Sequence, residues 1–136
     1  MLEEHAQEKV FLAPPQAYEL ARLYNLKSFN SFQEMIQKRE RYGCERWFPV
    51  ITTYADGAIS TLPGDELYPK DVDLFGKLPM PDYPLSINEM REKSIKINRI
   101  ELRGIVCLSL CNQQLNCGHL SPVSYPSITT GIQSML

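Results

Sequence analysis

Three of the four cysteines and one of the two histidines lie close together near the C-terminal end of the sequence. They form a C-x3-C-x5-C-x-H pattern made of Cys107, Cys111, Cys117 and His119. Thiolates and imidazoles are the ligands that Zn²⁺ prefers, and four of them complete a tetrahedral site. The spacing fits no common zinc module, so zinc binding stays an alternative to an ordinary uncharged tail. The fourth cysteine, Cys44, is expected to be a small buried residue.

A second group that could do chemistry is acidic. Five carboxylates gather in the middle of the chain: Asp56, Asp65, Glu66, Asp71 and Asp73. Oxygen ligands of this kind can hold a hard divalent cation. Acidic residues beside Pro63-Gly64 are also typical of turns, because their side chains bond to nearby backbone N–H groups. We favour the turn interpretation and expect no metal-binding residue here.

No nucleophile can be given a base from the sequence. His5 and His119 are the only histidines, and each lies in a terminal segment. A serine or cysteine nucleophile needs a positioned base to act. We therefore predict no catalytic and no cofactor-binding residue in this chain.

Helical periodicity, capping residues and prolines predict four helices. Asn30 or Ser31 is expected to cap the third, which has the clearest apolar spacing and ends near Gly43, and Ser86 is expected to cap the fourth. The predicted helices span Leu2–Val10, Gln16–Asn25, the residues from 30 to 42, and Ile87–Lys93.

A β-hairpin is predicted between the third and fourth helices. Trp47–Tyr54 is rich in β-branched and aromatic residues, Ala55-Asp56-Gly57 is a turn, and Ala58–Leu62 returns antiparallel. We expect Trp47 to pack the hairpin against the third helix. A further strand is predicted from residue 95 to Arg103, after an irregular proline-rich segment.

The charge distribution suggests a boundary near Gly104. The 136 residues carry 14 Lys plus Arg and 16 Asp plus Glu, and none of these lies after Gly104. We expect residues 1–104 to form the folded part and residues 105–136 to be a disordered tail whose removal leaves the rest stable. A net charge of −2 argues against nucleic acid as a partner. The absence of a long apolar run argues against a membrane span.

Two segments resemble a known family. PPQ-x-YE-x-x-RL within Phe11–Leu23, followed by ADG and LPGDELY within Glu45–Tyr68, is similar to the C-terminal region of acyl-coenzyme A diphosphatases of the Nudix hydrolase superfamily. The similarity extends over roughly residues 2–73. It implies the C-terminal part of a Nudix-type α/β/α domain plus its extension, and hence an α+β fold with two or three helices packed on the hairpin.

The same resemblance implies a function for the parent family. Its members cleave the diphosphate of coenzyme A and acyl-coenzyme A with Mg²⁺ or Mn²⁺, which a glutamate-rich R-E-x-x-E-E-x-G helix holds. This sequence has two Arg-Glu pairs, Arg39-Glu40 and Arg91-Glu92, but neither is followed by paired glutamates. We therefore expect a fragment or isoform of such an enzyme that is not catalytic by itself. The alternative is a small autonomous interaction module whose uncharged Cys-rich tail binds a partner or zinc.

The family resemblance also implies a compartment. Its members are peroxisomal or mitochondrial, but this chain ends Ser134-Met135-Leu136, in which Met135 replaces the basic residue of an S-K-L signal. We expect weak import, or none, and a cytoplasmic location for this chain.

Overall fold

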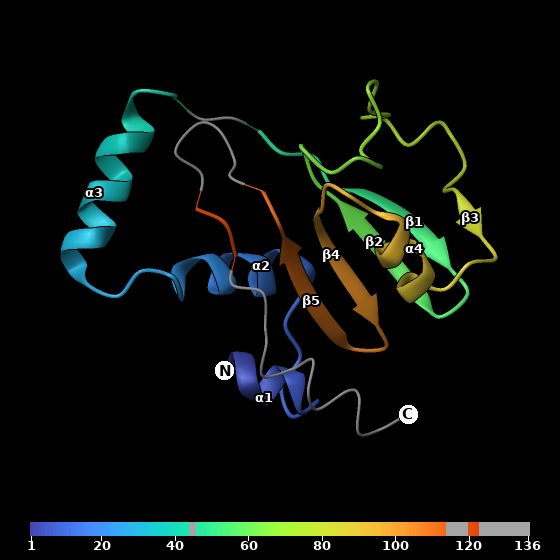
Figure 1. The fold of residues 1–136 in the computed structure, drawn as a ribbon, viewed down its shortest axis with the longest axis horizontal. Coiled ribbons are helices and arrows are strands. Elements are labelled where there is room, and N and C mark those ends of the chain that lie inside the picture. The colour runs from blue at the N-terminus through green and yellow to red at the C-terminus, as the bar shows by residue number, and fades with distance from the viewer. Residues whose placement is uncertain (44–45, 114–119, 123–136) are drawn as a thin grey trace.

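A five-stranded mixed sheet forms the centre of the computed structural model, which describes residues 1–43, 46–113 and 120–122. Its strands are β1 (Val50–Tyr54), β2 (Gly57–Thr61), β3 (Asp82–Tyr83), β4 (Asn98–Arg103) and β5 (Val106–Cys111). They lie in the order β3-β1-β2-β4-β5 (Figure 1). All neighbouring pairs are antiparallel except β1 and β3, which are parallel. The predicted α+β class is confirmed.

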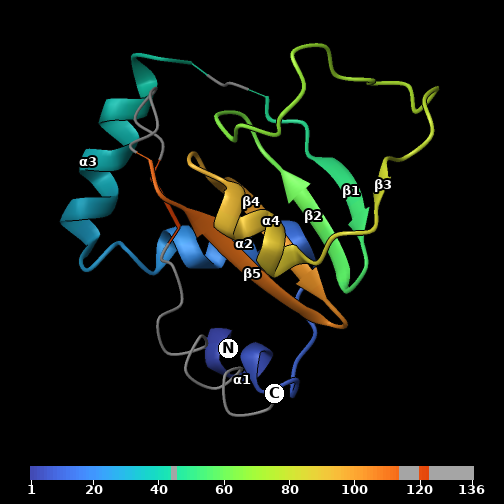
Figure 2. The same ribbon diagram turned by 45° about the vertical axis from the view of Figure 1, so that its right-hand side comes forward.

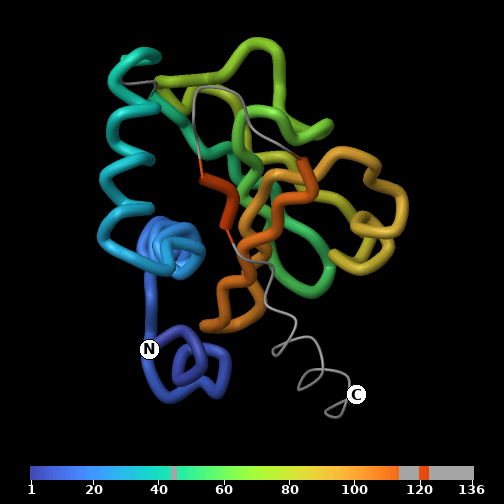
Figure 3. The backbone as a smooth tube through the Cα atoms, turned by 60° about the vertical axis from the view of Figure 1, so that its left-hand side comes forward, coloured from blue at the N-terminus to red at the C-terminus, as the bar shows by residue number. Residues whose placement is uncertain are grey.

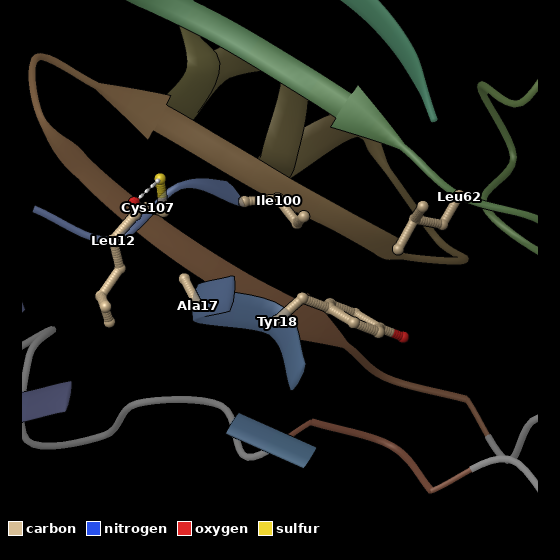
Figure 4. Close-up of a cluster of buried hydrophobic side chains, with 6 residues drawn as sticks. All are labelled: Leu12, Ala17, Tyr18, Leu62, Ile100 and Cys107. Atoms are coloured by element: carbon tan, nitrogen blue, oxygen red, sulfur yellow. Dashed lines mark hydrogen bonds between the residues drawn. The ribbon is translucent and has the colours of Figure 1, made fainter. Parts of the chain in front are cut away.

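Four helices surround the sheet, and two of them cover its opposite faces. The helices are α1 (Leu2–Ala6), α2 (Pro14–Leu23), α3 (Phe29–Glu40) and α4 (Ile87–Lys93). Figure 2 shows α4 crossing one face while α2 lies behind the other, against β4 and β5. The α2 face buries Leu12, Ala17, Tyr18, Leu62, Ile100 and Cys107 (Figure 4). The α4 face buries Tyr54, Ile59 and Ile87.

The hairpin turn depends on a glycine. Gly57 has φ of 151°, and a Cβ added there would lie 2.1 Å from the carbonyl oxygen of Leu102 on the neighbouring strand β4. Side chains are therefore excluded for two reasons, backbone conformation and direct overlap. The predicted turn at residues 55–57 is confirmed, and the glycine also allows β2 to approach β4.

Helix α1 is shorter than predicted, and His5 accounts for this. The ring Nε2 of His5 accepts a hydrogen bond from the Cys107 backbone N–H at 3.0 Å, and Nδ1 lies 2.9 Å from the Val10 carbonyl oxygen. These contacts turn the chain back on itself after Ala6, with Glu8 at φ of 57°. The side chain of His5 thereby covers a backbone N–H at the outer edge of β5.

Helix α3 does not pack on the hairpin, contrary to expectation. It begins after Ser28, whose hydroxyl accepts from the Ser31 N–H, so Ser28 is the cap in place of Asn30 or Ser31. None of its residues is buried. Figure 3 shows α3 running up beside α2 and away from the sheet. Trp47 instead contacts Tyr18 of α2, with ring centroids 6.4 Å apart.

The predicted boundary at Gly104 is wrong for the first part of the tail. Residues 105–113 are described, and Val106–Cys111 forms β5, which pairs with all six residues of β4. Gly104 lies in the turn between these two strands, at φ of 58°. An uncharged apolar run of this length is typical of a buried strand. Leu120 and Ser121 also contact the fold through their carbonyl oxygens, which accept from Arg22 and Asn25.

Asp65 and Arg99 form a fully buried ion pair at the end of the second strand of the hairpin. Arg99 Nε donates to Asp65 Oδ2 at 2.6 Å and Nη2 donates to Oδ1 at 2.8 Å. The carboxylate also accepts from the backbone N–H groups of Leu67 and Asn98. Both side chains have no exposed surface. Removing either partner of such a pair leaves the other charge buried and unpaired, which strongly destabilises the folded state.

We predict that deleting residues 105–136 abolishes cooperative unfolding. The deletion removes β5, the contact of Cys107 with His5, and the strand against which α2 packs. A second truncation after Pro122 keeps every described residue and serves as the control. Thermal unfolding followed by circular dichroism is the measurement. A sigmoidal transition in the shorter protein at the control's Tm would show that the tail is dispensable.

Replacing Gly57 should cost more than replacing another glycine of positive φ. We expect Gly57→Ala to destabilise the protein by more than about 1 kcal/mol, because the new Cβ meets the Leu102 carbonyl. Gly104→Ala is the matched control, since no atom lies within 4 Å of its added Cβ and only the backbone strain remains. Urea denaturation gives both free energies of unfolding. Equal losses would show that overlap with β4 is not the cause.

Asp65→Asn should be strongly destabilising, by about 3–5 kcal/mol, because it leaves the buried Arg99 guanidinium without its counter-charge. The control is Glu66→Gln at the next position, where the side chain is exposed and the loss should be much smaller. The double variant Asp65→Leu with Arg99→Met should recover part of the stability. Urea denaturation gives the free energies of unfolding. Equal losses for Asp65→Asn and Glu66→Gln would contradict the role assigned to the pair.

Candidate functional site

A cavity of about 530 Å³ lies between α2 and the part of the sheet that α2 leaves uncovered. We call it the α2 cavity. Its walls come from α2, from the segment that links α3 to β1, and from β1, β2 and β4, and Arg39 reaches it from α3. The residues that line it are Pro14, Pro15, Tyr18, Glu19, Arg22, Arg39, Gly43, Trp47, Pro49, Ile51, Ser60, Leu62, Ile100 and Leu102.

The register of the sheet explains its apolar floor. Ile51 pairs with Ser60 across β1 and β2, and Ser60 pairs with Ile100 across β2 and β4. Directly paired residues point to the same face of a sheet, so these three side chains form a row beneath the cavity. Helix α2 packs over β4 and β5 and does not extend over β1. Ile51 is therefore 44% exposed although it lies on the core side of the sheet.

Helix α2 begins with two prolines that line the cavity. Pro14 and Pro15 occupy the first turn of α2, where their missing N–H groups are not needed, and Gln16 Oε1 accepts from the Ala13 N–H at 3.0 Å. Pro14, Pro15, Tyr18, Glu19 and Arg22 all belong to the segment that carries the family resemblance. That segment thus forms much of the cavity wall.

Two charged side chains of α2 neutralise each other at the cavity. Arg22 Nη1 donates to both carboxylate oxygens of Glu19, at 2.6 and 2.8 Å, and its Nε donates to the Leu120 carbonyl. Its guanidinium carbon also lies 5.9 Å from the centroid of the Tyr18 ring. Arg39 makes no ion pair with any residue of the described part of the chain. Among the described residues that line the cavity, arginines therefore exceed carboxylates by one.

Tyr18 stays neutral in this setting. Its hydroxyl donates to Asn98 Oδ1 at 3.3 Å, and burial, as the main cause, raises its pKa well above the ordinary value. A neutral phenol bonded inside the protein is a poor acid or base near pH 7. The described lining residues therefore offer a shaped apolar surface with one cation that has no described ion-pair partner.

The turn interpretation describes only part of what the acidic residues do. Asp65 and Asp73 accept from backbone N–H groups within five residues, but Asp56 and Glu66 accept from backbone distant in the sequence. Asp65 is committed to Arg99, and Glu66 accepts from the backbone N–H groups of Ile95 and Lys96. These backbone bonds lower the pKa of Glu66, as the Leu78 and Phe75 N–H groups do for Asp73. Asp56 accepts from the Ile87 N–H at 2.7 Å.

Within residues 1–43, 46–113 and 120–122, no three His, Cys, Asp or Glu side chains gather as metal ligands. In the segment from Asp56 to Asp73, the carboxylates of Asp56, Glu66 and Asp73 accept from backbone N–H groups and that of Asp65 pairs with Arg99. This donor set does not fit the Mg²⁺ or Mn²⁺ that the resemblance implies, because hard cations need several free oxygens pointing at one centre.

The zinc hypothesis is not supported by its two described cysteines. Cys107 and Cys111 lie four residues apart on β5, which separates them by roughly 13 Å along an extended strand. Sulfurs that share one Zn²⁺ lie within about 4.6 Å, twice the Zn–S distance. The Cys107 thiol is also buried beside the Leu12 carbonyl, and burial raises its pKa. Cys44, Cys117 and His119 lie outside the described residues.

The two Arg-Glu pairs have no common role. Arg91 of α4 pairs with Glu101 of β4, a carboxylate with no exposed surface, so this arginine holds the helix on the sheet. Arg39 faces the α2 cavity. The sequence analysis considered Arg39 only as part of a possible catalytic motif. Its place in the cavity was not predicted, because the residues that line the cavity with it are spread through the sequence, from Pro14 to Leu102.

Among the described helices, none is long and apolar enough to cross a membrane.

Comparison with known proteins shows what the chain is similar to. Residues 51–112 match the family described as "NUDT19 C-terminal domain". Over 99% of its length the chain is 38% identical to a Gallus gallus protein named acyl-coenzyme A diphosphatase NUDT19, and over 93% it is 36% identical to the Xenopus laevis protein of that name. A human protein of the same name is 41% identical over 56% of the chain.

The alignments cover 36%, 33% and 20% of these three relatives, so the chain spans about a third of the length of the two it matches most fully. No solved structure matches it significantly. The matched domain begins in β1 and ends just after β5, so it includes the strand that was expected to lie in a tail. The family resemblance is confirmed: the chain is a relative of the acyl-coenzyme A diphosphatase NUDT19 over most of its length, with residues 51–112 matching the C-terminal domain.

Proposed function

We propose that this chain is the C-terminal part of an acyl-coenzyme A diphosphatase, and that it does not cleave coenzyme A on its own. The observation that carries the proposal is the alignment of nearly the whole chain with about a third of two named diphosphatases. The match of residues 51–112 to a C-terminal domain supports placing this third at the C-terminal end of the complete enzyme.

The chemistry of the reaction supports a division of labour. Diphosphate hydrolysis near neutral pH uses divalent metal to neutralise the phosphate oxygens and to activate water. Asp56, Asp65, Glu66 and Asp73, the described carboxylates closest to a possible cation site, bond to backbone N–H groups or to Arg99, and the sequence lacks the glutamate-rich helix. In this proposal Mg²⁺ or Mn²⁺ is held by other residues of the complete enzyme, and no residue of this chain is catalytic, metal-binding or cofactor-binding.

A small autonomous interaction module is the less favoured function. Its zinc-binding form requires the cysteines of β5 to share a metal, and their separation along the strand opposes this. The location of the complete enzyme in peroxisomes or mitochondria is likewise part of the proposal and follows from the family resemblance alone.

We predict that the purified 136-residue protein, with Mg²⁺ or Mn²⁺, releases no adenosine bisphosphate from acyl-coenzyme A above the blank without enzyme. The Gallus gallus relative is the positive control. A chimera of that relative, in which this chain replaces the matching segment, should keep hydrolysing the substrate, because the chain then completes an enzyme that supplies the metal site.

Two outcomes would contradict the proposal. One is activity of the isolated chain that survives repurification and disappears in Asp65→Asn or Glu66→Gln. The other is a chimera that unfolds cooperatively at the Tm of its parent and yet is inactive.

A further inference from the structure

The α2 cavity has the composition of a site for an apolar chain. Its walls are mostly proline rings, aromatic rings and aliphatic side chains, among them Trp47, Ile51, Leu62 and Leu102. Its volume of about 530 Å³ lies in the range of small-ligand sites, roughly 300–1,000 Å³. The Tyr18 hydroxyl, an uncharged polar group of the wall, already bonds to Asn98. Such a surface recognises methylene groups through the hydrophobic effect and makes few demands for hydrogen bonds.

The charges at the cavity favour an anionic ligand over a cationic one. Glu19 is neutralised by Arg22, whose side chain is only 8% exposed. Arg39 comes from a helix without buried residues, and no described residue forms an ion pair with it. A ligand with an apolar chain and an anionic head group therefore complements both the apolar walls and the charge of the described lining residues.

We propose that the α2 cavity binds the fatty-acyl chain of an acyl-coenzyme A, with Arg39 facing the phosphate-bearing part of the molecule. This inference rests on the proposed function, because the acyl thioester comes from the substrate named for the relatives. It gives the non-catalytic third of the enzyme a task, since contacts with a remote part of the substrate supply binding energy for the reaction elsewhere.

The chain carries its own reporter for this ligand. Trp47 is the single tryptophan and lines the cavity, so its fluorescence should respond when an acyl chain enters. We propose titrating the 136-residue protein with octanoyl-, decanoyl- and dodecanoyl-coenzyme A below their micelle concentrations, and with free coenzyme A. Trp47 emission should change with the acyl compounds, and the affinity should rise about threefold to fourfold per added methylene. Free coenzyme A should leave the emission unchanged.

Two matched pairs of variants locate the site. Ile51→Glu places a charge in the cavity and should weaken dodecanoyl-coenzyme A binding by at least tenfold. Ile105→Glu is its control, since Ile105 is 43% exposed and Ile51 is 44% exposed, but Ile105 lies in the turn beyond β4. Arg39→Gln should weaken the binding of dodecanoyl-coenzyme A more than the binding of dodecanol, which has no charge. The neighbouring substitution Lys38→Gln should change neither affinity.

The outcomes separate this inference from the proposed function. Absence of any response to dodecanoyl-coenzyme A, equal affinity at all chain lengths, or equal effects of Ile51→Glu and Ile105→Glu would overturn it. So would Trp47 emission that changes with protein concentration alone, which would show that a second copy covers the cavity. If the chimera is active but Trp47 emission does not respond to acyl-coenzyme A, only the acyl site is refuted. If acyl-coenzyme A binds but the folded chimera is inactive, only the proposed function is refuted.

Discussion

The ion pair of Asp65 and Arg99 is the interaction on which the arrangement of the sheet depends. Asp65 lies just after β2 and Arg99 lies in β4, so the pair fixes the end of the hairpin to the strand that follows it 34 residues later. The neighbouring Asn98 extends this link, because its amide donates to the Pro63 carbonyl and its oxygen accepts from Tyr18 of α2. One continuous set of hydrogen bonds therefore joins α2, β4 and the turn after β2.

This set explains why the LPGDELY segment has the residues that it has. Asp65 binds Arg99, Glu66 binds the backbone that leads into β4, and the Tyr68 hydroxyl donates to the Phe48 carbonyl before β1. Each polar side chain of the segment holds a piece of backbone that is distant in the sequence. A carboxylate occupied in this way cannot also bind a cation without leaving its donors unpaired, and this cost opposes a metal site. The polar residues of the LPGDELY segment therefore stabilise the fold by connecting distant parts of the chain.

Local patterns predicted the local parts of the fold. The hairpin turn at Gly57 and the Ser86 cap of α4 depend on residues a few positions apart, so sequence reasoning could find them. Arg99 and Glu101 are both fully buried, and they could not be foreseen as interior residues, because Asp65 and Arg91 must be brought to them by the fold. The strand β5 was missed because the loss of charge after Gly104 was taken to indicate a tail.

The cavity escaped prediction for a related reason, and this bears on how the chain contributes to an enzyme. Its floor is a row of three side chains from three strands, and its wall is a helix that precedes them by some 30 residues or more, so no short motif marks it. One face of the sheet buries charge pairs under α4, and the other keeps its apolar surface partly open beside α2. On the charged face Asp65 and Glu101 are each paired with an arginine. On the α2 side Ile51 is still 44% exposed, so an apolar ligand or a neighbouring segment that covers it gains free energy from its burial.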